Sequence, residues 1–428
     1  MTAASSGPHV LVVASTFPAG PDDTVPRFVY DQVIALARVR PQWRFTVLAP
    51  HDGRSVTADR TEHDAFTERR FHYLRPRRWQ SLAGHGIMPA IRSNPLQILA
   101  VPALLWGEYR AIRSIVRQER PDIVYAHWFT PQALCAAPVA ARARIPLVFT
   151  THASDVAVWG RFGGFGRALV SAVTRRAGRF TAVSETSMLR MKPFFDEAGW
   201  ARVRERAQVI PMGVELTTGT VADDLGRASR GRRTVLFMGR LAEKKGVRFL
   251  LEAFATVQAS MPDVDLVVAG DGPLRADLEA RSRRLGLQDR VSFVGYRSGP
   301  AKDELYRRAD VCVLPSIVTD DGDAEGLPVA LLEALAYGVP TIASEASNAG
   351  EVVDSGVDAV VCPAGDAAAL GRALEDMLSW PAERRAAMST AARRTAQRFD
   401  WNHVAEQTAQ FLLDPFLGGH RAPDTSAE

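Results

Sequence analysis

Short apolar runs alternate with helical patterns along nearly the whole chain, and this alternation most constrains what the chain can fold into. The runs His9–Ser15 and Phe45–Ala49 have the length of strands, and Val25–Arg38 between them places apolar side chains at helical spacing. Because the strands are rich in Val and Leu throughout, they indicate a parallel sheet that helices cover on both faces. The sequence therefore predicts an α/β fold with doubly wound sheets.

The pattern occurs twice. The stretch between Pro211 and Arg233 is rich in Gly, Thr, Asp and Arg without an apolar period, which is typical of a linker, and 428 residues suffice for two domains. We predict two Rossmann-like domains that face each other across a cleft, with ligands at the carboxyl ends of their strands. The predicted parts are an N-terminal domain over 1–210, a linker over 211–232, a second domain over 233–396, a helix over 397–414 that can cross back to the first domain, and a flexible tail over 415–428.

Charge is divided unevenly between the halves. Residues 1–215 contain 28 Lys and Arg against 17 Asp and Glu, a formal +11, whereas residues 216–428 contain 24 against 31, a formal −7. A basic half can bind nucleic acid, an anionic membrane or a phosphorylated acceptor, and it can equally carry solvated arginines without a partner. Nucleic acid is suggested by this charge and by no other feature of the sequence, so we do not expect it as a partner.

The cysteines indicate the compartment. Cys135, Cys312 and Cys362 lie in apolar runs and have neither disulfide nor zinc spacing, as buried thiols in a reducing compartment do. No secretion signal is recognisable, and the most lipid-like stretch, Ile98–Trp106, is short and contains Pro102. We expect a cytoplasmic protein, with peripheral contact at the inner membrane face as an option.

Two loops of the second half are suited to a phosphate. In Phe237–Gly246 a strand ends at Gly239 and the turn before the next helix carries Arg240 and two lysines, which can reach an anion at a helix N-terminus. In Val268–Leu274 two glycines let the backbone approach a ligand closely. Each loop alone also fits a plain interpretation, an exposed basic turn for the first and a tight turn for the second.

Two carboxylates flank the start of a helix within Ala324–Pro340. Pro328 has the fixed φ that suits the first helical turn and Gly338 suits the helix end. Glu325 is therefore expected in the loop before the helix, and Glu333 about a turn and a half inside it. Because a helix N-terminus attracts anions, this arrangement favours holding a charged nucleotide sugar over the symmetric acid–base pair of a glycosidase.

In order and spacing these motifs resemble the retaining glycosyltransferases of family 4, which have the GT-B fold. The resemblance covers essentially the whole chain and is very specific in the C-terminal half. The matching stretches are Gly239-Arg240-Leu241 with Lys245-Gly246, Gly270-Asp271-Gly272-Pro273, Phe293–Tyr296, Ala309–Ser316 and the Glu-x7-Glu of Glu325 and Glu333, and more loosely Ser15–Pro18, Ala126–Trp128, Phe149–Asp155 and Ala182–Ser184.

The resemblance implies a role for each matching residue. Arg240 and Lys245 would bind the donor diphosphate and stabilise charge on the departing nucleotide, and Glu333 would bind the ribose. The donor sugar would be held by Glu325 and the backbone N–H groups of Gly326 and Leu327. The backbone would approach the donor at Gly20, Gly239, Gly270 and Gly272, and His152 would face the reacting sugar, with Asp155 beside it. His127 and Trp128 would either line the acceptor pocket or belong to the core.

The resemblance also implies retention of configuration without a protein nucleophile, with the donor phosphate accepting the acceptor's proton and with no metal or other cofactor. The sequence has no DxD-like motif placed to hold a metal, since Asp320–Asp323 is expected to be a solvated loop. Three stretches depart from the family's pattern. The first loop has one glycine, Gly20, in place of two, Val209–Glu215 carries Met212, and Ser347 and Asn348 replace two glycines near the donor site. The Arg, Lys and Glu set is intact, so we expect an active enzyme.

The expected function is transfer of a hexose from a UDP- or GDP-sugar to a hydroxyl of a polysaccharide, glycolipid or lipid-linked acceptor. One alternative is a transferase that tailors a soluble natural product, and another is a nucleotide-sugar-binding or epimerising protein of the same fold. The basic and aromatic stretch Phe71–Trp79 suggests contact with a membrane surface or a lipid phosphate, and it also fits an irregular surface loop.

Overall fold

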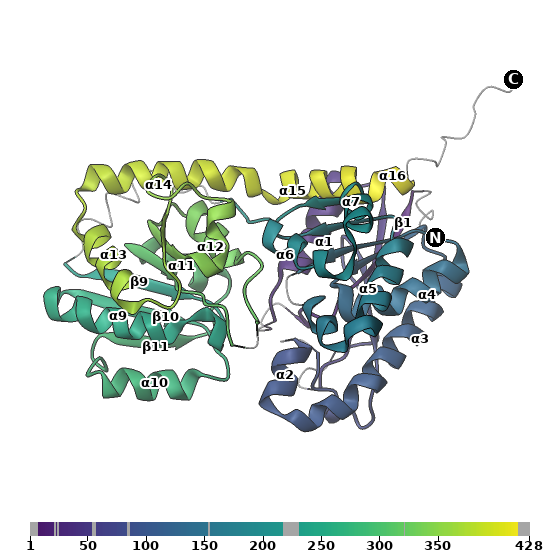
Figure 1. The fold of residues 1–428 in the computed structure, drawn as a ribbon, viewed down its shortest axis with the longest axis horizontal. Helices are drawn as coiled ribbons and strands as arrows, with labels where there is room; N and C mark the ends of the chain where they lie inside the picture. Colours follow the sequence, from purple (N-terminus) through teal and green to yellow (C-terminus); the bar gives the residue numbers. More distant parts are fainter. Residues whose placement is uncertain are drawn as a thin grey trace, which may run out of the picture. The chain divides into compact units, whose positions relative to one another are not determined.

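The chain folds into two compact units in the computed structural model (Figure 1). Unit 1 comprises Met1–Pro211 with Trp401–Glu428, and unit 2 comprises Met212–Asp400. The structure describes residues 7–20, 23, 25–53, 57–83, 86–152, 155–216, 231–320 and 322–417, so most of the predicted linker and the predicted tail from 418 onward lie outside the described residues. Within the described ranges, no helix combines the length and apolar character needed to cross a membrane.

Unit 1 is built on an eight-stranded sheet in the order β3-β4-β2-β1-β5-β6-β7-β8, in which all pairs are parallel except β3 with β4. The central strand β1 is buried along its whole length, as a strand covered on both faces must be. The strands are β1 (His9–Val13), β2 (Arg44–Pro50), β3 (Arg60–Glu62), β4 (Thr67–Phe71), β5 (Ile123–His127), β6 (Leu147–Thr151), β7 (Arg179–Ala182) and β8 (Ala207–Val209).

Helices cover both faces of this sheet, and short helical turns connect them. The α-helices are α1 (Phe28–Val39), α2 (Ile87–Ser93), α3 (Val101–Glu119), α4 (Leu134–Ala143), α5 (Gly163–Arg176), α6 (Glu185–Leu189) and α7 (Glu197–Arg204). The turns are η1 (Arg77–Trp79), η2 (Pro95–Ala100), η3 (Phe129–Ala133), η4 (Ala157–Phe162) and η5 (Lys192–Phe194).

The C-terminal segment completes unit 1. It consists of α15 (Trp401–Thr408), η10 (Ala409–Leu413) and α16 (Asp414–Leu417), drawn in yellow beside α1 in Figure 1. Arg40, at the end of α1, holds this segment through ion pairs with Glu406 at 2.7 Å and Asp414 at 2.6 Å. The first and last residues of unit 2 lie side by side, as the hydrogen bond from Val214 N–H to Phe399 O at 2.8 Å shows.

Unit 2 has a six-stranded, fully parallel sheet in the order β11-β10-β9-β12-β13-β14. Its strands are β9 (Arg233–Met238), β10 (Val264–Ala269), β11 (Val291–Gly295), β12 (Val311–Leu314), β13 (Thr341–Ser344) and β14 (Val360–Cys362). Its helices are α9 (Val247–Ser260), α10 (Arg275–Arg284), α11 (Gly299–Arg308), α12 (Val329–Ala336), α13 (Ala367–Ser379) and α14 (Ala382–Ala396), with the short turns η6 (Glu243–Lys245), η7 (Glu345–Ser347), η8 (Ala349–Glu351) and η9 (Gln397–Phe399).

Each sheet has one point where the strand order reverses, between β9 and β12 in unit 2 and between β1 and β5 in unit 1. Ligands of open α/β sheets bind outside the carboxyl ends of the strands at such a switch point. The loops that follow these four strands contain most of the residues singled out by the sequence. The three cysteines are buried, as predicted.

Candidate functional site

Two loops meet backbone to backbone at the switch point of unit 2. Gly270 has φ +145°, and a Cβ built on it would lie 1.8 Å from the carbonyl oxygen of Gly239, while one on Gly272 would lie 2.5 Å from that of Leu241. Leu241 N–H donates to Asp271 O at 2.9 Å, which ties the loop after β9 to the loop after β10. We expected these glycines to let the backbone approach a ligand closely. In the structure they let the backbone approach the neighbouring loop of Gly239 and Leu241. They fix the position of the turn that carries Arg240, a partly buried residue at the end of β9.

A buried carboxylate lies between two lysines in the same region. Lys245 Nζ is 3.1 Å from Glu325 Oε2, and Lys244 Nζ is 3.7 Å from Glu325 Oε1 and 3.3 Å from Asp323 Oδ1. Burial alone would raise the pKa of Glu325, but the two ammonium groups lower it below the usual value. Glu325 is thus an ionised carboxylate, and Lys245, which is largely buried beside it, is held in place by that charge.

The helix after Glu325 begins at Val329, one residue later than predicted, with Pro328 as its N-cap. Gly338, at φ +63°, follows the helix end as expected. Glu333 therefore lies just over one turn inside α12. Its carboxylate accepts from Tyr306 OH at 2.8 Å and pairs with Lys302 Nζ at 2.5 Å, both from α11.

Asn348 occupies one of the positions where the family's glycines were missing. It has φ +58°, a left-handed conformation that Asn adopts more readily than most residues. Its side-chain amide donates to the carbonyl oxygens of Glu325 at 2.9 Å and Gly326 at 2.7 Å. The residue therefore meets the backbone requirement of the lost glycine and orients the loop of Glu325, Gly326 and Leu327. Sequence reasoning missed this role, as well as Lys302 and Tyr306, although a positive-φ position that tolerates Asn was a usable signal.

In unit 1 the predicted acceptor-side residues gather at the ends of β5 and β6. His127 Nδ1 lies 3.2 Å from His152 Nε2, and the rings of Trp128 and Phe28 lie against His152 at 4.6 and 5.3 Å between centroids. Trp128 is turned toward this cluster by a left-handed backbone, φ +76°. His127 is completely buried, which favours the core interpretation for that residue.

Asp155 organises this corner of unit 1. One carboxylate oxygen accepts from Phe129 N–H at 2.5 Å, and the other accepts from Thr151 Oγ1 at 2.7 Å and from His152 N–H at 3.2 Å. These bonds fix the Thr151 side chain and the backbone N–H of His152 and tie them to the start of η3. Asp155 thus positions His152, while its own carboxylate oxygens are occupied by these groups.

Burial keeps both histidines neutral. It lowers the pKa of His152 to about 3 and that of His127 well below the usual value, to which the neighbouring imidazole adds. At neutral pH the pair therefore offers uncharged imidazoles that can accept or donate a hydrogen bond but carry no positive charge.

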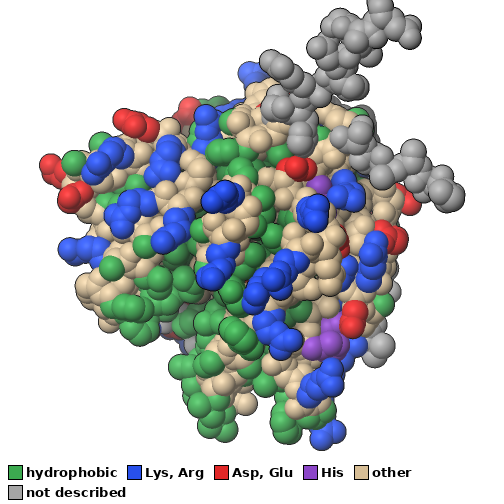
Figure 2. Space-filling view, turned by 90° about the vertical axis from the view of Figure 1, so that its right-hand side faces the viewer, with side chains coloured by type: hydrophobic (Ala, Val, Ile, Leu, Met, Phe, Trp, Pro, Cys, Tyr) green, Lys and Arg blue, Asp and Glu red, His purple; other side chains and the backbone are tan. Residues whose placement is uncertain are grey.

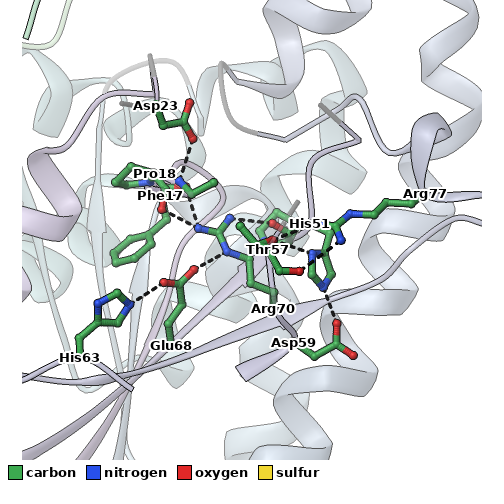
Figure 3. A network of polar contacts seen from close by, with 12 residues as sticks. Phe17, Pro18, Asp23, His51, Thr57, Asp59, His63, Glu68, Arg70 and Arg77 are labelled. Atoms are coloured by element: carbon green, nitrogen blue, oxygen red, sulfur yellow. Dashed lines mark hydrogen bonds and ion pairs between the residues drawn. The ribbon is translucent and has the colours of Figure 1, made fainter. Parts of the chain in front are cut away.

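The loop of Gly20, after β1, is held from below by Arg70 of β4 (Figure 3). This buried guanidinium donates to the carbonyl oxygens of Phe17 at 3.2 Å and Pro18 at 2.7 Å, and it is paired with Glu68. Asp23 closes the same loop, because its carboxylate accepts from Ala19 N–H at 2.7 Å. Among the atoms of the described residues, a Cβ on Gly20 would meet none within 4 Å, so these residues leave space at that position.

One group of described side chains has the composition of a metal site, namely His51, Asp59 and His72. The Nε2 atoms of the two histidines lie 2.8 and 3.2 Å from the same Asp59 oxygen. Gln80 fixes the tautomer of His72: its Oε1 accepts from Tyr73 N–H at 2.8 Å, so its amide N–H donates to His72 Nδ1 at 3.1 Å. This leaves a proton on His72 Nε2, where a metal would need a lone pair, and the pattern favours a hydrogen-bonded cluster.

Comparison with known proteins agrees with this geometry. Residues 25–218 match the family model described as Glycosyltransferase Family 4, and residues 226–395 match the one described as Glycosyl transferases group 1. A glycogen synthase of Mycobacterium tuberculosis (strain ATCC 25618 / H37Rv) is 29% identical over 308 residues, 69% of this chain and 70% of its own. The 2-deoxystreptamine glucosyltransferase of Streptomyces kanamyceticus is 29% identical over 288 residues, 64% and 72% of the two chains.

A solved structure shows the same fold. The Anabaena protein Alr3699/HepE, in complex with UDP and glucose, superposes with a TM-score of 0.66 at 20% identity, covering 94% of this chain and 99% of its own. The two family models match consecutive parts of the chain, the relatives are glycosyltransferases, and the fold has two parallel-sheet units. The chain therefore belongs to the family 4 glycosyltransferases and has the GT-B fold.

Proposed function

We propose that the enzyme transfers a hexose from a UDP- or GDP-sugar, with retention of configuration, to a hydroxyl of a polysaccharide, glycolipid or lipid-linked acceptor. The observation that carries the proposal is the buried Glu325 between two lysines at the switch point of unit 2. When the ammonium group of Lys245 binds a diphosphate, Glu325 keeps the ammonium group of Lys244 as a neighbour. The buried carboxylate is then not left without a counter-charge, so the free-energy cost of moving Lys245 is small.

In this proposal Lys245 and Arg240 bind the donor diphosphate and stabilise its growing negative charge as the glycosidic bond breaks. Glu333 binds the ribose hydroxyls. Its present partners, Lys302 and Tyr306, are a cation and a hydroxyl, and ribose hydroxyls would replace or join the hydroxyl donor. Glu325 and the backbone N–H groups of Gly326 and Leu327 hold the sugar.

Chemically, the bond between the anomeric carbon and the donor phosphate breaks while a bond to the acceptor oxygen forms on the same face of the sugar. The acceptor's proton moves to the departing phosphate oxygen, so no protein nucleophile is required. His152 is proposed to hydrogen-bond the reacting sugar as a neutral imidazole, which agrees with its lowered pKa. No step in this proposal uses a metal or another cofactor.

The donor is tested by a thermal-shift screen with UDP-, GDP- and ADP-sugars, since a ligand of the folded state must raise the unfolding temperature. We expect one nucleotide series to stabilise the protein and Glu333→Ala to remove that shift. A protein that no nucleotide sugar stabilises would contradict the proposed donor site.

A second candidate is a transferase for a soluble small molecule, which the 2-deoxystreptamine glucosyltransferase relative favours. Transfer to soluble hydroxyl acceptors in detergent-free buffer would support it over a lipid-linked acceptor.

A further inference from the structure

The turn η2 and the first turns of α3 expose large apolar side chains on unit 1. Leu96, Ile98, Leu99 and Trp106 are 74, 58, 77 and 61% exposed, and we call these four residues the apolar tip. They are close in the chain, since η2 leads directly into α3. No residue of the proposed donor or acceptor site belongs to this group. Apolar side chains exposed together in this way mark an interaction surface more often than isolated ones do.

The same helix continues the apolar tip with arginines. Arg110, Arg113 and Arg117 follow Trp106 at spacings of four, three and four residues, so they extend along the side of α3 opposite its buried face. All three are exposed, and within the part of the chain that the structure describes none forms an ion pair. We call these three residues the arginine row. Over the length from Trp106 to Arg117 the helix rises by about 16 Å.

The stretch Phe71–Trp79 packs beside α3. Gly107 of α3 packs against it, since a Cβ on Gly107 would lie 3.1 Å from Tyr73 Cβ. Phe71 and Tyr73 are buried, whereas the exposed members of the stretch include Arg75, Arg78 and Trp79. Figure 2 looks onto the side of the molecule where α3 lies, and it shows Lys and Arg side chains across that side and hydrophobic ones gathered at its lower edge.

We propose that the apolar tip and the arginine row form a docking surface for an anionic lipid bilayer. Exposed Leu and Trp side chains at a helix start can enter the boundary between head groups and acyl chains, where Trp is favoured. Arginines along the same helix attract anionic head groups, each by about fivefold in affinity. Either signal alone gives weak, reversible binding, whereas the two together, on η2 and the adjoining α3, give stable binding.

The charge of the surface distinguishes a bilayer from other occupants. A second copy that docked through the same face would place one arginine row near another, and like charges oppose that contact. A nucleic acid would satisfy the arginines but leave the apolar tip exposed to water. An anionic bilayer matches both parts. The inference rests on the proposed function only in that a lipid-linked acceptor gives docking its purpose, and binding itself does not require transfer.

Flotation of the full-length protein with vesicles tests the proposal, without donor or acceptor. Vesicles of phosphatidylcholine with phosphatidylglycerol should carry the protein, with binding that weakens as salt rises, and vesicles of phosphatidylcholine alone should carry far less. Arg110→Glu/Arg113→Glu should lower affinity for the mixed vesicles at least tenfold. Leu96→Ser/Leu99→Ser should lower it to a similar extent while the remaining binding stays salt-dependent. The matched control is Arg283→Glu/Arg284→Glu on α10, two exposed arginines of unit 2 with the same charge change, and it should bind as the unaltered protein does.

Several outcomes would overturn the proposal. In the vesicle assay they are failure to bind mixed vesicles, equal binding by all variants, and an equal loss of binding in the α10 control. Self-association that the Leu96/Leu99 change removes would indicate a second copy as the occupant. Binding of duplex DNA or RNA that the Arg110/Arg113 change removes would indicate a nucleic acid. Unfolding temperature checks that each variant is folded. Because transfer to a soluble acceptor is measured separately, an enzyme that binds vesicles without transferring sugar would refute the proposed function and leave the docking surface standing.

Discussion

The loops at the switch point of unit 2 and those at the switch point of unit 1 are built in different ways. In unit 2 the proposed site residues lie within contiguous motifs, and two of their loops are placed by residues of other motifs, Gly270 and Asn348. In unit 1 the corresponding corner is assembled from the ends of β1, β5 and β6. Asp155 follows His152 by three residues, whereas Arg70, which supports the loop of Gly20, comes from β4. The proposed donor residues can therefore be located from short motifs, whereas the support of the loop of Gly20 by Arg70 cannot.

Replacing Lys245 with Ala should have the largest effect, because it removes a cation proposed to stabilise the leaving diphosphate. We expect kcat/KM for transfer to fall by at least about 10²- to 10³-fold while thermal unfolding stays cooperative. Lys244→Ala is the matched control, since Lys244 is farther from Glu325 and also pairs with Asp323, and it should cost much less. Unchanged turnover in the Lys245 variant would show that the donor site is elsewhere.

Gly270→Ala contrasts with Gly20→Ala and compares the two units directly. The first puts a Cβ 1.8 Å from a backbone oxygen at φ +145° and should destabilise the protein by about 4 kcal/mol. The second puts a Cβ where no atom of the described residues lies within 4 Å, and it should change stability by less than about 0.5 kcal/mol. Urea unfolding measures both, and similar losses in the two variants would refute the distinction between a packed and an open glycine loop.

Arg70→Gln tests whether unit 1 depends on its distant support. The change leaves Glu68, which is only 7% exposed, without its buried partner, and we expect a loss of about 3 kcal/mol in unfolding free energy. Arg69→Gln breaks the neighbouring, more exposed pair with Glu119 and should cost about 1 kcal/mol or less. If the two variants unfold at the same urea concentration, the hydrogen bonds from Arg70 to the loop of Gly20 and its pair with Glu68 do not stabilise the fold.

The pH dependence of stability should report on His152, with the smallest effect. Its pKa is lowered in the folded state, so below pH 6.5 the unfolded chain binds the proton more readily and stability falls as the pH falls toward 3. Between pH 7 and pH 5 the native protein should lose at most about 2 kcal/mol more than His152→Phe, which keeps an aromatic ring but does not titrate. Parallel pH profiles of stability for the two proteins would show that folding does not lower the pKa of His152.

The positions of some site residues could be predicted from the sequence, and the contacts of others could not, for a physical reason. The position of Glu325 before α12 and of Glu333 within it could be predicted, because Pro328 and Gly338 act on the backbone locally. The role of Asn348 could not, since its amide bonds to residues more than twenty positions away. Nor could the pairing of Lys302 and Tyr306 with Glu333, for which α11 and α12 must first pack together.

By itself the sequence determined the alternation of strands and helices, the two parallel sheets and the turns that follow β9 and β12, because apolar period, Gly and Pro act over a few residues. The tertiary structure alone decided that the C-terminal helices pack on α1, that Gly270 makes room for the loop of Gly239, and that Arg70 supports the loop of Gly20. Those contacts join residues far apart in the chain, and their energies depend on burial and distance that exist only once the sheet has formed.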